Sequence, residues 1–143
     1  MAEQLKEHIK DPGSAITHFI GMLMAIFAAI IFGMMSCLAP KIKNVTIDDL
    51  DWERTIDIEE VVTHIIAIAV YAASLILLYA ASTTYHTFDK SRKVNTILKK
   101  IDHMMISVLI AGSYTPICLL VLGGRTGLIL LAIVWAFAIA GIL

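Results

Sequence analysis

Four apolar runs restrict the fold of this chain more than any other feature. They cover residues 17–38, 61–85, 104–122 and 127–143. A helix rises 1.5 Å per residue, so about 20 residues cross the ~30 Å hydrocarbon layer of a bilayer, and each of the first three runs supplies about that length. The runs therefore predict an all-α integral membrane protein, a polytopic bundle of four transmembrane helices within residues 17–143.

The amino-acid composition also indicates that the chain is surrounded by a lipid bilayer. Hydrophobic residues make up 59% of the 143 residues and charged residues 16%, with a mean hydropathy of +0.84. The charges lie between the apolar runs rather than within them, so membrane lipids are the predicted partners, and no nucleic-acid partner is predicted. The first run is longer than a signal-peptide core and is expected to be a retained anchor. The fourth run reaches Leu143 without a polar end, and we expect the chain to be part of a longer protein.

The basic residues predict an orientation. Seven Lys and Arg residues fall in the N-terminal segment 1–16 and in the link between the second and third runs, and four fall on the opposite side. The positive-inside rule then places residues 1–16 in the cytoplasm, in a multi-pass protein of the cell membrane. The link from Pro40 to Glu60 carries seven acidic residues and is predicted to be a solvated external loop, because its spacing matches no calcium-binding loop.

Several other residues favour structural roles. Cys37 and Cys118 lie in apolar surroundings and are predicted to be buried free thiols. His64 is expected at the external membrane interface. Pro116 lies inside the third helix and should kink it, while Gly112 favours a close helix contact.

Five polar residues converge on the predicted cytoplasmic side. Successive helices run in opposite directions, so the start of the first, the end of the second and the start of the third helix share one side of the membrane. The residues at these positions are His18, Ser82, His86, Asp102 and His103. Ionisable groups at membrane depth are costly unless they face protein or water, which makes this group the candidate functional site.

The spacing of these residues leaves two interpretations open. Ser82 and His86 are four residues apart and share a helix face, and Asp102 can approach them from the next helix. A hydrolytic triad is disfavoured, because no glycine-framed nucleophile elbow surrounds Ser82. The same residues could form part of a metal site. Alternatively, His86 is an interfacial histidine and Asp102 an N-cap of the third helix.

Four segments together resemble the hemolysin III family, the bacterial branch of the progestin and adipoQ receptor superfamily. They are DPGSAITHFIG at residues 11–21, ASTTYH at 81–86, IDH at 101–103 and AGSYTP at 111–116. They occur in the expected order and cover most of the chain from Asp11 to Pro116. The resemblance implies a seven-helix membrane core with a zinc ion near its cytoplasmic side, of which this chain holds four helices.

The resemblance also implies roles for individual residues. The S-x-x-x-H segment places a zinc-binding histidine at His86 and its serine at Ser82. The D-H segment places at Asp102 an aspartate that holds or activates a zinc-bound water, while Thr17 and His18 have supporting roles. The remaining two zinc ligands belong to an H-x-x-x-H segment that this sequence lacks. A catalytic zinc site normally has three protein ligands, so the other ligands are expected beyond Leu143.

Three functions are compatible with this resemblance. Related eukaryotic proteins are associated with receptor signalling and ceramide hydrolysis, which suggests a zinc-dependent hydrolase that cleaves an amide or ester of a membrane lipid, with Asp102 and Ser82 as its catalytic residues. The family name suggests a membrane-permeabilising cytolysin. A regulator of membrane state with a structural zinc ion is the third candidate. The sequence predicts neither the substrate nor the oligomeric state.

Overall fold

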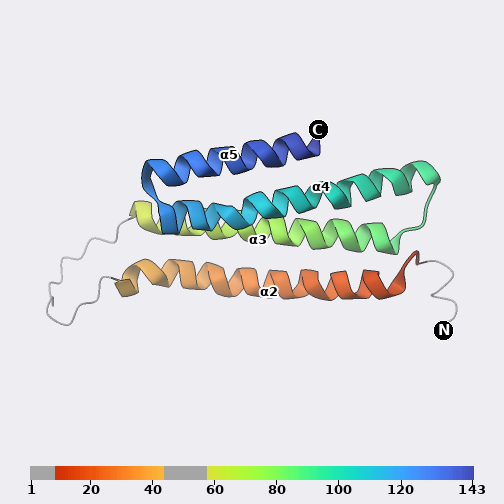
Figure 1. Cartoon of the computed structure of the whole chain (residues 1–143). Helices are drawn as coiled ribbons and strands as arrows, with labels where there is room; N and C mark the ends of the chain where they lie inside the picture. Colours follow the sequence, from red (N-terminus) through yellow and green to blue (C-terminus); the bar gives the residue numbers. More distant parts are fainter. Residues whose placement is uncertain (1–8, 44–57) are drawn as a thin grey trace, which may run out of the picture.

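The protein is an array of long helices (Figure 1). The computed structural model describes residues 9–43 and 58–143, without the side chains of residues 37–43 and 58. The described part contains helices α2 (Pro12–Lys43), α3 (Ile58–Thr87), α4 (Arg92–Pro116), the π-helix η1 (Ile117–Leu122) and α5 (Gly124–Ile142). Its extended pairing is a single isolated bridge between Ile9 and Phe88, so the predicted all-α fold is confirmed for this part of the chain.

Four segments are long and apolar enough to cross a membrane. They are Pro12–Ser36, Glu59–Thr87, Arg92–Leu122, which combines α4 with η1, and Gly124–Ile142. The predicted polytopic membrane architecture is therefore confirmed in its number of spans within the described residues. Most of the predicted acidic loop, residues 44–57, lies outside them.

The helices extend beyond the apolar runs because polar residues cap them. Asp11 precedes Pro12, the first residue of α2, and its carboxylate accepts a hydrogen bond from the Ser14 hydroxyl at 2.6 Å. Proline suits the first helical position, where its missing N–H leaves no bond unmade. The Ser91 side chain accepts from the Val94 N–H at 3.4 Å, so α4 begins at Arg92 and not at the first apolar residue, Met104.

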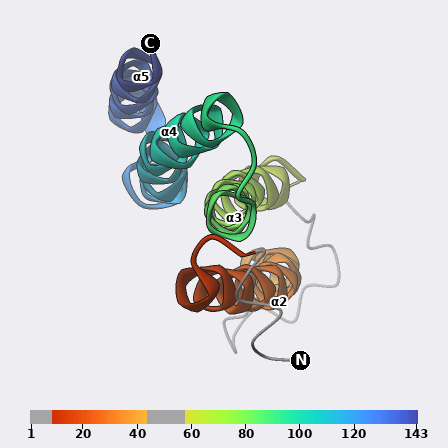
Figure 2. The same cartoon turned by 90° about the vertical axis from the view of Figure 1, so that its right-hand side faces the viewer.

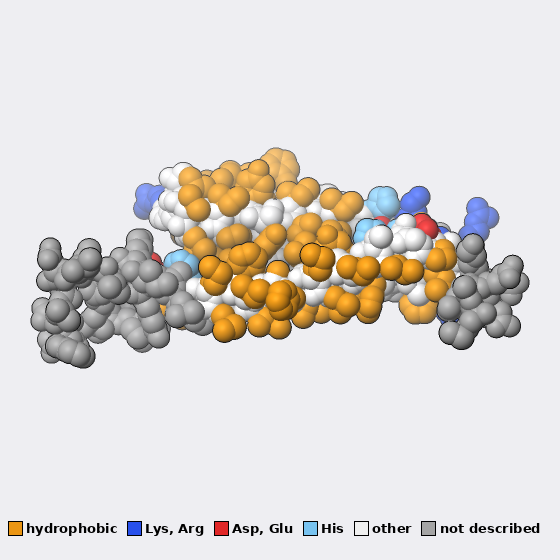
Figure 3. Space-filling model, turned by 90° about the horizontal axis from the view of Figure 1, so that it is seen from below, with side chains coloured by type: hydrophobic (Ala, Val, Ile, Leu, Met, Phe, Trp, Pro, Cys, Tyr) orange, Lys and Arg blue, Asp and Glu red, His pale blue; other side chains and the backbone are white. Residues whose placement is uncertain are grey.

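The helices are arranged in a row. Each packs mainly against its neighbours in sequence, and Figure 2 shows the order α2, α3, α4, α5 from one side of the molecule to the other. The buried apolar residues are small, namely Ala15, Ala25, Ala67, Ala111, Cys118 and Ala138. Small residues let helix backbones approach closely in a membrane. Many of the larger apolar side chains are exposed instead, and Figure 3 shows them covering one face of the molecule.

Gly112 makes the predicted close helix contact. A Cβ atom added at Gly112 would overlap the Ser74 side chain of α3, and Gly112 itself is buried. Ser74 is buried as well, and its hydroxyl donates to the Tyr71 carbonyl at 2.7 Å. The interface between α3 and α4 therefore depends on the absence of a side chain at this position.

The chain changes from α4 to a π-helix immediately after Pro116. Proline has no N–H to continue the α-helical hydrogen bonds. The regular α-helix ends at this residue, and the six-residue π-helix η1 follows it. The Gly123 N–H donates to the Cys118 carbonyl at 3.0 Å, and Gly123 and Gly124 have φ angles of 58° and 53°. These left-handed conformations favour glycine and turn the chain into α5. The Cys118 thiol is buried and free, as predicted, whereas the side chain of Cys37 is not among those described.

Candidate functional site

The predicted polar cluster lies where one set of helix ends meets, at one end of the molecule along the helix axes. We call this the basic end. It comprises the start of α2, the end of α3 and the first half of α4, together with Lys10, Lys90, Arg92, Lys93, Lys99 and Lys100. Figure 3 shows histidine, acidic and basic side chains gathered there beyond the hydrophobic middle of the molecule. His64 lies near the other end of α3, about 33 Å from His86 at 1.5 Å per residue, so the two histidines are separated as predicted.

His86 is the centre of the contacts at the basic end. Its ring stacks on the ring of His18, with centroids 5.5 Å apart and an interplanar angle of 18°. The Tyr85 ring meets it edge-on, with centroids 4.9 Å apart. Its Nδ1 atom lies 3.5 Å from a carboxylate oxygen of Asp11, and 22% of its side chain is exposed. The structure therefore brings His18 and His86 together and adds Asp11, to which the sequence analysis gave no role.

The residues before α2 attach to the end of α3 through their backbone. The Asp11 N–H donates to the His86 carbonyl at 3.0 Å, and the Lys10 N–H donates to the Thr87 carbonyl at 3.4 Å. The Lys10 ammonium lies 3.5 Å from the centroid of the Tyr85 ring, a cation–π geometry. These contacts hold the segment that carries Asp11 against the end of α3, and the Asp11 carboxylate therefore lies beside the His86 ring.

The Asp11 carboxyl predicts a local pH dependence. Hydrogen bonds from the Ser14 side chain and backbone lower its pKa below the ordinary value of 3.8, with a smaller contribution from the charge of His86. A group with a lowered folded-state pKa stabilises the fold above its ordinary pKa, and this stabilisation is lost as pH falls through the lowered value. We expect the first turn of α2 to loosen only below pH 3.8. Amide exchange at Ser14 across this range measures the loosening, and Asp11→Asn should remove its pH dependence; an unchanged profile in that variant would contradict the assignment.

Ser82 and Asp102 occupy less exposed positions around this centre. Ser82 is buried one helical turn before His86 on α3. Asp102 lies inside α4 with 16% of its side chain exposed, and one of its oxygens is 3.8 Å from Nδ1 of its neighbour His103. The alternative in which Asp102 caps the third helix is wrong, because α4 already begins at Arg92 with Ser91 as its cap. The ion pairs within 4.0 Å at this end, counted over the described residues, join His86 to Asp11 and Asp102 to His103, and none joins His86 to Asp102.

The described residues do not complete a metal site. No group of three or more His, Cys, Asp or Glu side chains within residues 9–43 and 58–143 is arranged to hold a metal ion. Zinc sites in proteins use at least three such donors, so the donor set of this chain fits zinc only as a contribution to a larger site. His86 is suited to that contribution, because ligating histidines commonly place their second ring nitrogen against a carboxylate, as His86 does with Asp11.

Asp11 is the residue that the sequence analysis missed, although a signal for it was present. Aspartate followed by proline and then by a serine three residues after the aspartate is typical of a helix N-terminus. That signal would have moved the start of the first helix to Pro12 and placed a carboxylate at the basic end. Its pairing with His86 depends on how α2 and α3 pack, which the signal does not contain.

Comparisons with known proteins cover nearly the whole chain. Residues 7–143 match the family model described as haemolysin-III related. The chain is 36% identical to hemolysin-3 of Bacillus cereus over 143 residues, which are 100% of this chain and 54% of that protein. It is also 36% identical to a hemolysin-3 homolog of Bacillus subtilis (strain 168) over 138 residues, 96% of this chain and 54% of that protein. The chain thus spans about half the length of these relatives, and no solved structure gives a significant match.

Proposed function

This chain belongs to the haemolysin-III-related family, and from that membership we propose that it forms part of a zinc-dependent hydrolase that cleaves an amide or ester bond of a membrane lipid. His86 contributes one zinc ligand, and the other ligands come from residues outside these 143. The protein resides in the cell membrane, with its N-terminus and the basic end on the cytoplasmic side. The excess of basic residues at that end supports this orientation.

The arrangement around His86 is the observation that carries the proposal. A carboxylate oxygen lies 3.5 Å from Nδ1 of His86 and the His18 ring stacks on it, an arrangement in which Nε2 would be the nitrogen that binds a metal. The cluster lies near the ends of the candidate spans, which supports a site level with the headgroups and carbonyl groups of lipids.

Each candidate residue then has a distinct task. A bound zinc ion with an open position would supply a water of lowered pKa. The carboxylate of Asp102 is the proposed proton acceptor, since it is shielded from solvent and lies on the helix next to α3. Ser82, one turn from His86, would hold the substrate or the water by a hydrogen bond. The stacked His18 keeps the His86 ring in place.

Elemental analysis of detergent-purified protein tests the metal assignment. We expect about one zinc ion per chain in a longer product read from the same locus, and far less in the 143-residue chain, because one histidine cannot hold zinc tightly. Absence of zinc in both forms would refute the metal site, and His86 would then be an interfacial packing residue.

The Asp102→Ala variant separates the proposed enzyme from the two other functions. In a zinc-containing form it should retain its metal and lose hydrolysis of a ceramide-type or ester lipid, typically by about 10²–10⁴-fold for the loss of a proton-transfer group. Lipid hydrolysis that never exceeds the uncatalysed background in the unmodified protein would contradict the proposed enzymatic activity. Folding that depends on zinc would then point to a structural ion, and lysis of red cells that survives His86→Ala would point to the cytolysin.

A further inference from the structure

The residues just before α2 form a short strap across the end of α3. The Lys10 N–H donates to the Thr87 carbonyl at 3.4 Å, and the Asp11 N–H donates to the His86 carbonyl at 3.0 Å. The last four carbonyl groups of a helix have no partner within that helix, and α3 ends at Thr87, so the strap satisfies two of them. This backbone pairing sets Asp11 opposite His86.

The Asp11 side chain contacts both the start of α2 and the His86 ring. Its Oδ2 atom accepts the Ser14 hydroxyl at 2.6 Å and lies 3.5 Å from Nδ1 of His86. Its Oδ1 atom accepts the Ser14 N–H at 3.5 Å. These two bonds restrict the rotation of the carboxylate. The 3.5 Å separation exceeds that of a short hydrogen bond, and the Asp11 side chain is 50% exposed, so its attraction for the ring is moderate.

The stacked His18 ring fixes the plane of the His86 ring but not its orientation within that plane. The two centroids are 5.5 Å apart and the rings are inclined by 18°. A half-turn about the bond between Cβ and the ring keeps the plane and exchanges each ring nitrogen with a ring carbon. The χ2 torsion of histidine is broad and roughly two-fold, so stacking permits both orientations. A polar partner distinguishes them, because only the nitrogens form hydrogen bonds.

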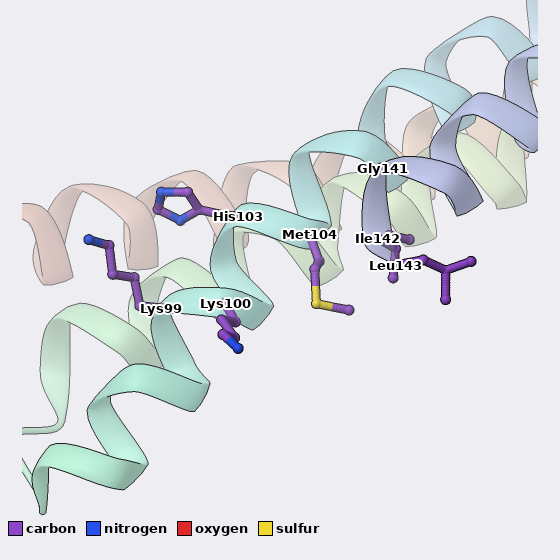
Figure 4. A pocket seen from close by; sticks show the side chains of 7 residues that line it. All are labelled: Lys99, Lys100, His103, Met104, Gly141, Ile142 and Leu143. Atoms are coloured by element: carbon purple, nitrogen blue, oxygen red, sulfur yellow. The ribbon is translucent and has the colours of Figure 1, made fainter.

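Asp11 is the carboxylate that faces His86. The histidine of α4, His103, has a different partner, because Asp102 lies 3.8 Å from its Nδ1 atom. His103 also lies near the end of α5, as Figure 4 shows, and not against the strap. The two histidines therefore have separate carboxylates, and the contact of Asp11 with His86 does not compete with the proton-accepting role proposed for Asp102.

We propose that Asp11 is a positioning residue for His86, an inference that rests on the proposed role of His86 as a zinc ligand. The carboxylate stabilises a proton on Nδ1 of the neutral ring. It thereby selects one ring orientation and the tautomer whose Nε2 has a free lone pair, before any metal binds. A ligand that is already oriented loses less conformational freedom on binding, so the metal is held more tightly. The strap is thus part of the metal site although it supplies no ligand.

Solid-state ¹⁵N NMR of metal-free protein in lipid bilayers tests this role. The histidine ring nitrogens are labelled, metal is removed with a chelator, and spectra are recorded in mildly alkaline buffer, where imidazole rings are neutral. The signals of His86 are those missing from His86→Ala, and their chemical shifts distinguish the two tautomers. We expect the ratio of the Nδ1–H to the Nε2–H tautomer of His86 to fall about three- to five-fold in Asp11→Ser, as for the loss of a half-exposed ionic contact.

Ser14→Ala is the matched control for Asp11→Ser. Serine at position 11 remains a good N-cap and keeps the backbone strap, but it is too short to reach the His86 ring. Ser14→Ala instead removes a hydrogen bond from the same helix start and keeps the carboxylate. It should leave the tautomer ratio within about two-fold of the unmodified value. Equal falls in the two variants, or no fall in Asp11→Ser, would overturn the role of the carboxylate.

Zinc affinity separates failure of this inference from failure of the proposed function. In a zinc-binding form, Asp11→Ser should weaken zinc binding by about ten-fold, the lower end of the range for residues that support a metal ligand. Unchanged affinity in Asp11→Ser, together with loss of zinc in His86→Ala, would overturn the role of Asp11 and leave His86 as a ligand. Absence of zinc from every form would refute the metal site, and the tautomer ratio would still decide whether Asp11 orients the ring.

Discussion

His86→Ala is expected to abolish zinc binding and lipid hydrolysis in a form of the protein that carries the complete site. Loss of a residue that only supports a metal ligand typically costs about 10–100-fold in metal affinity or activity. Loss of the ligand itself should therefore cost at least about 100-fold. The physical reason is that the ion would retain two protein ligands, too few for a tight tetrahedral site. Zinc per chain and the rate of lipid cleavage are the two measurements.

His64→Ala is the matched control for this substitution. It removes the same side chain from the same helix, but at the opposite end, where Nδ1 of His64 lies 2.8 Å from the Glu60 carbonyl. We expect zinc content and hydrolysis to be unchanged within about two-fold in this variant, because no residue of the His86 cluster is near it. Equal losses in the two variants would show that α3 tolerates neither change, and the role of His86 as a ligand would lose its support.

Membrane insertion could be predicted from the sequence because it depends on single segments. The length and hydropathy of each run identify a candidate span without knowledge of its neighbours, and the described residues contain four helices long and apolar enough to cross a membrane. Helix ends were harder to predict, since polar residues such as those from Arg92 to His103 continue a helix outside the hydrocarbon as readily as they form a link. The Ser91 cap decides between the two, and hydropathy does not record it.

In the candidate site, too, some features could be predicted from the sequence and others could not. The shared end of His18, Ser82, His86 and Asp102 follows from counting antiparallel spans, and the structure places all of them at the basic end. The pairing within that end does not follow from counting. His86 contacts Asp11 and His18, while Asp102 contacts His103, because side-chain partners depend on rotation of each helix about its axis. Family resemblance supplied the motif residues but assigned no role to Asp11.

The turn between η1 and α5 should be sensitive to a single added methyl group. A Cβ atom at Gly127 would overlap the backbone oxygen of Cys118, the atom that accepts the Gly123 N–H at 3.0 Å. A backbone oxygen cannot rotate away as a side chain can. Gly127→Ala must therefore shift α5 or break that hydrogen bond, and we expect a net destabilisation of about 1–3 kcal/mol, typical of overpacking. Unfolding of the detergent-solubilised chain by a denaturing detergent measures it.

Gly33→Ala is the control that shows whether the destabilisation comes from the contact with the Cys118 carbonyl. Gly33 lies within α2, and a Cβ atom added there would meet nothing within 4 Å. Alanine favours a helix by up to about 1 kcal/mol over glycine, so this variant should be as stable as the unmodified chain or slightly more stable. The same intrinsic gain applies at Gly127, which means that any loss there is a lower bound on the steric cost. If both variants gain stability, α5 does not pack against the Cys118 carbonyl, and the junction between the third and fourth spans has a different geometry.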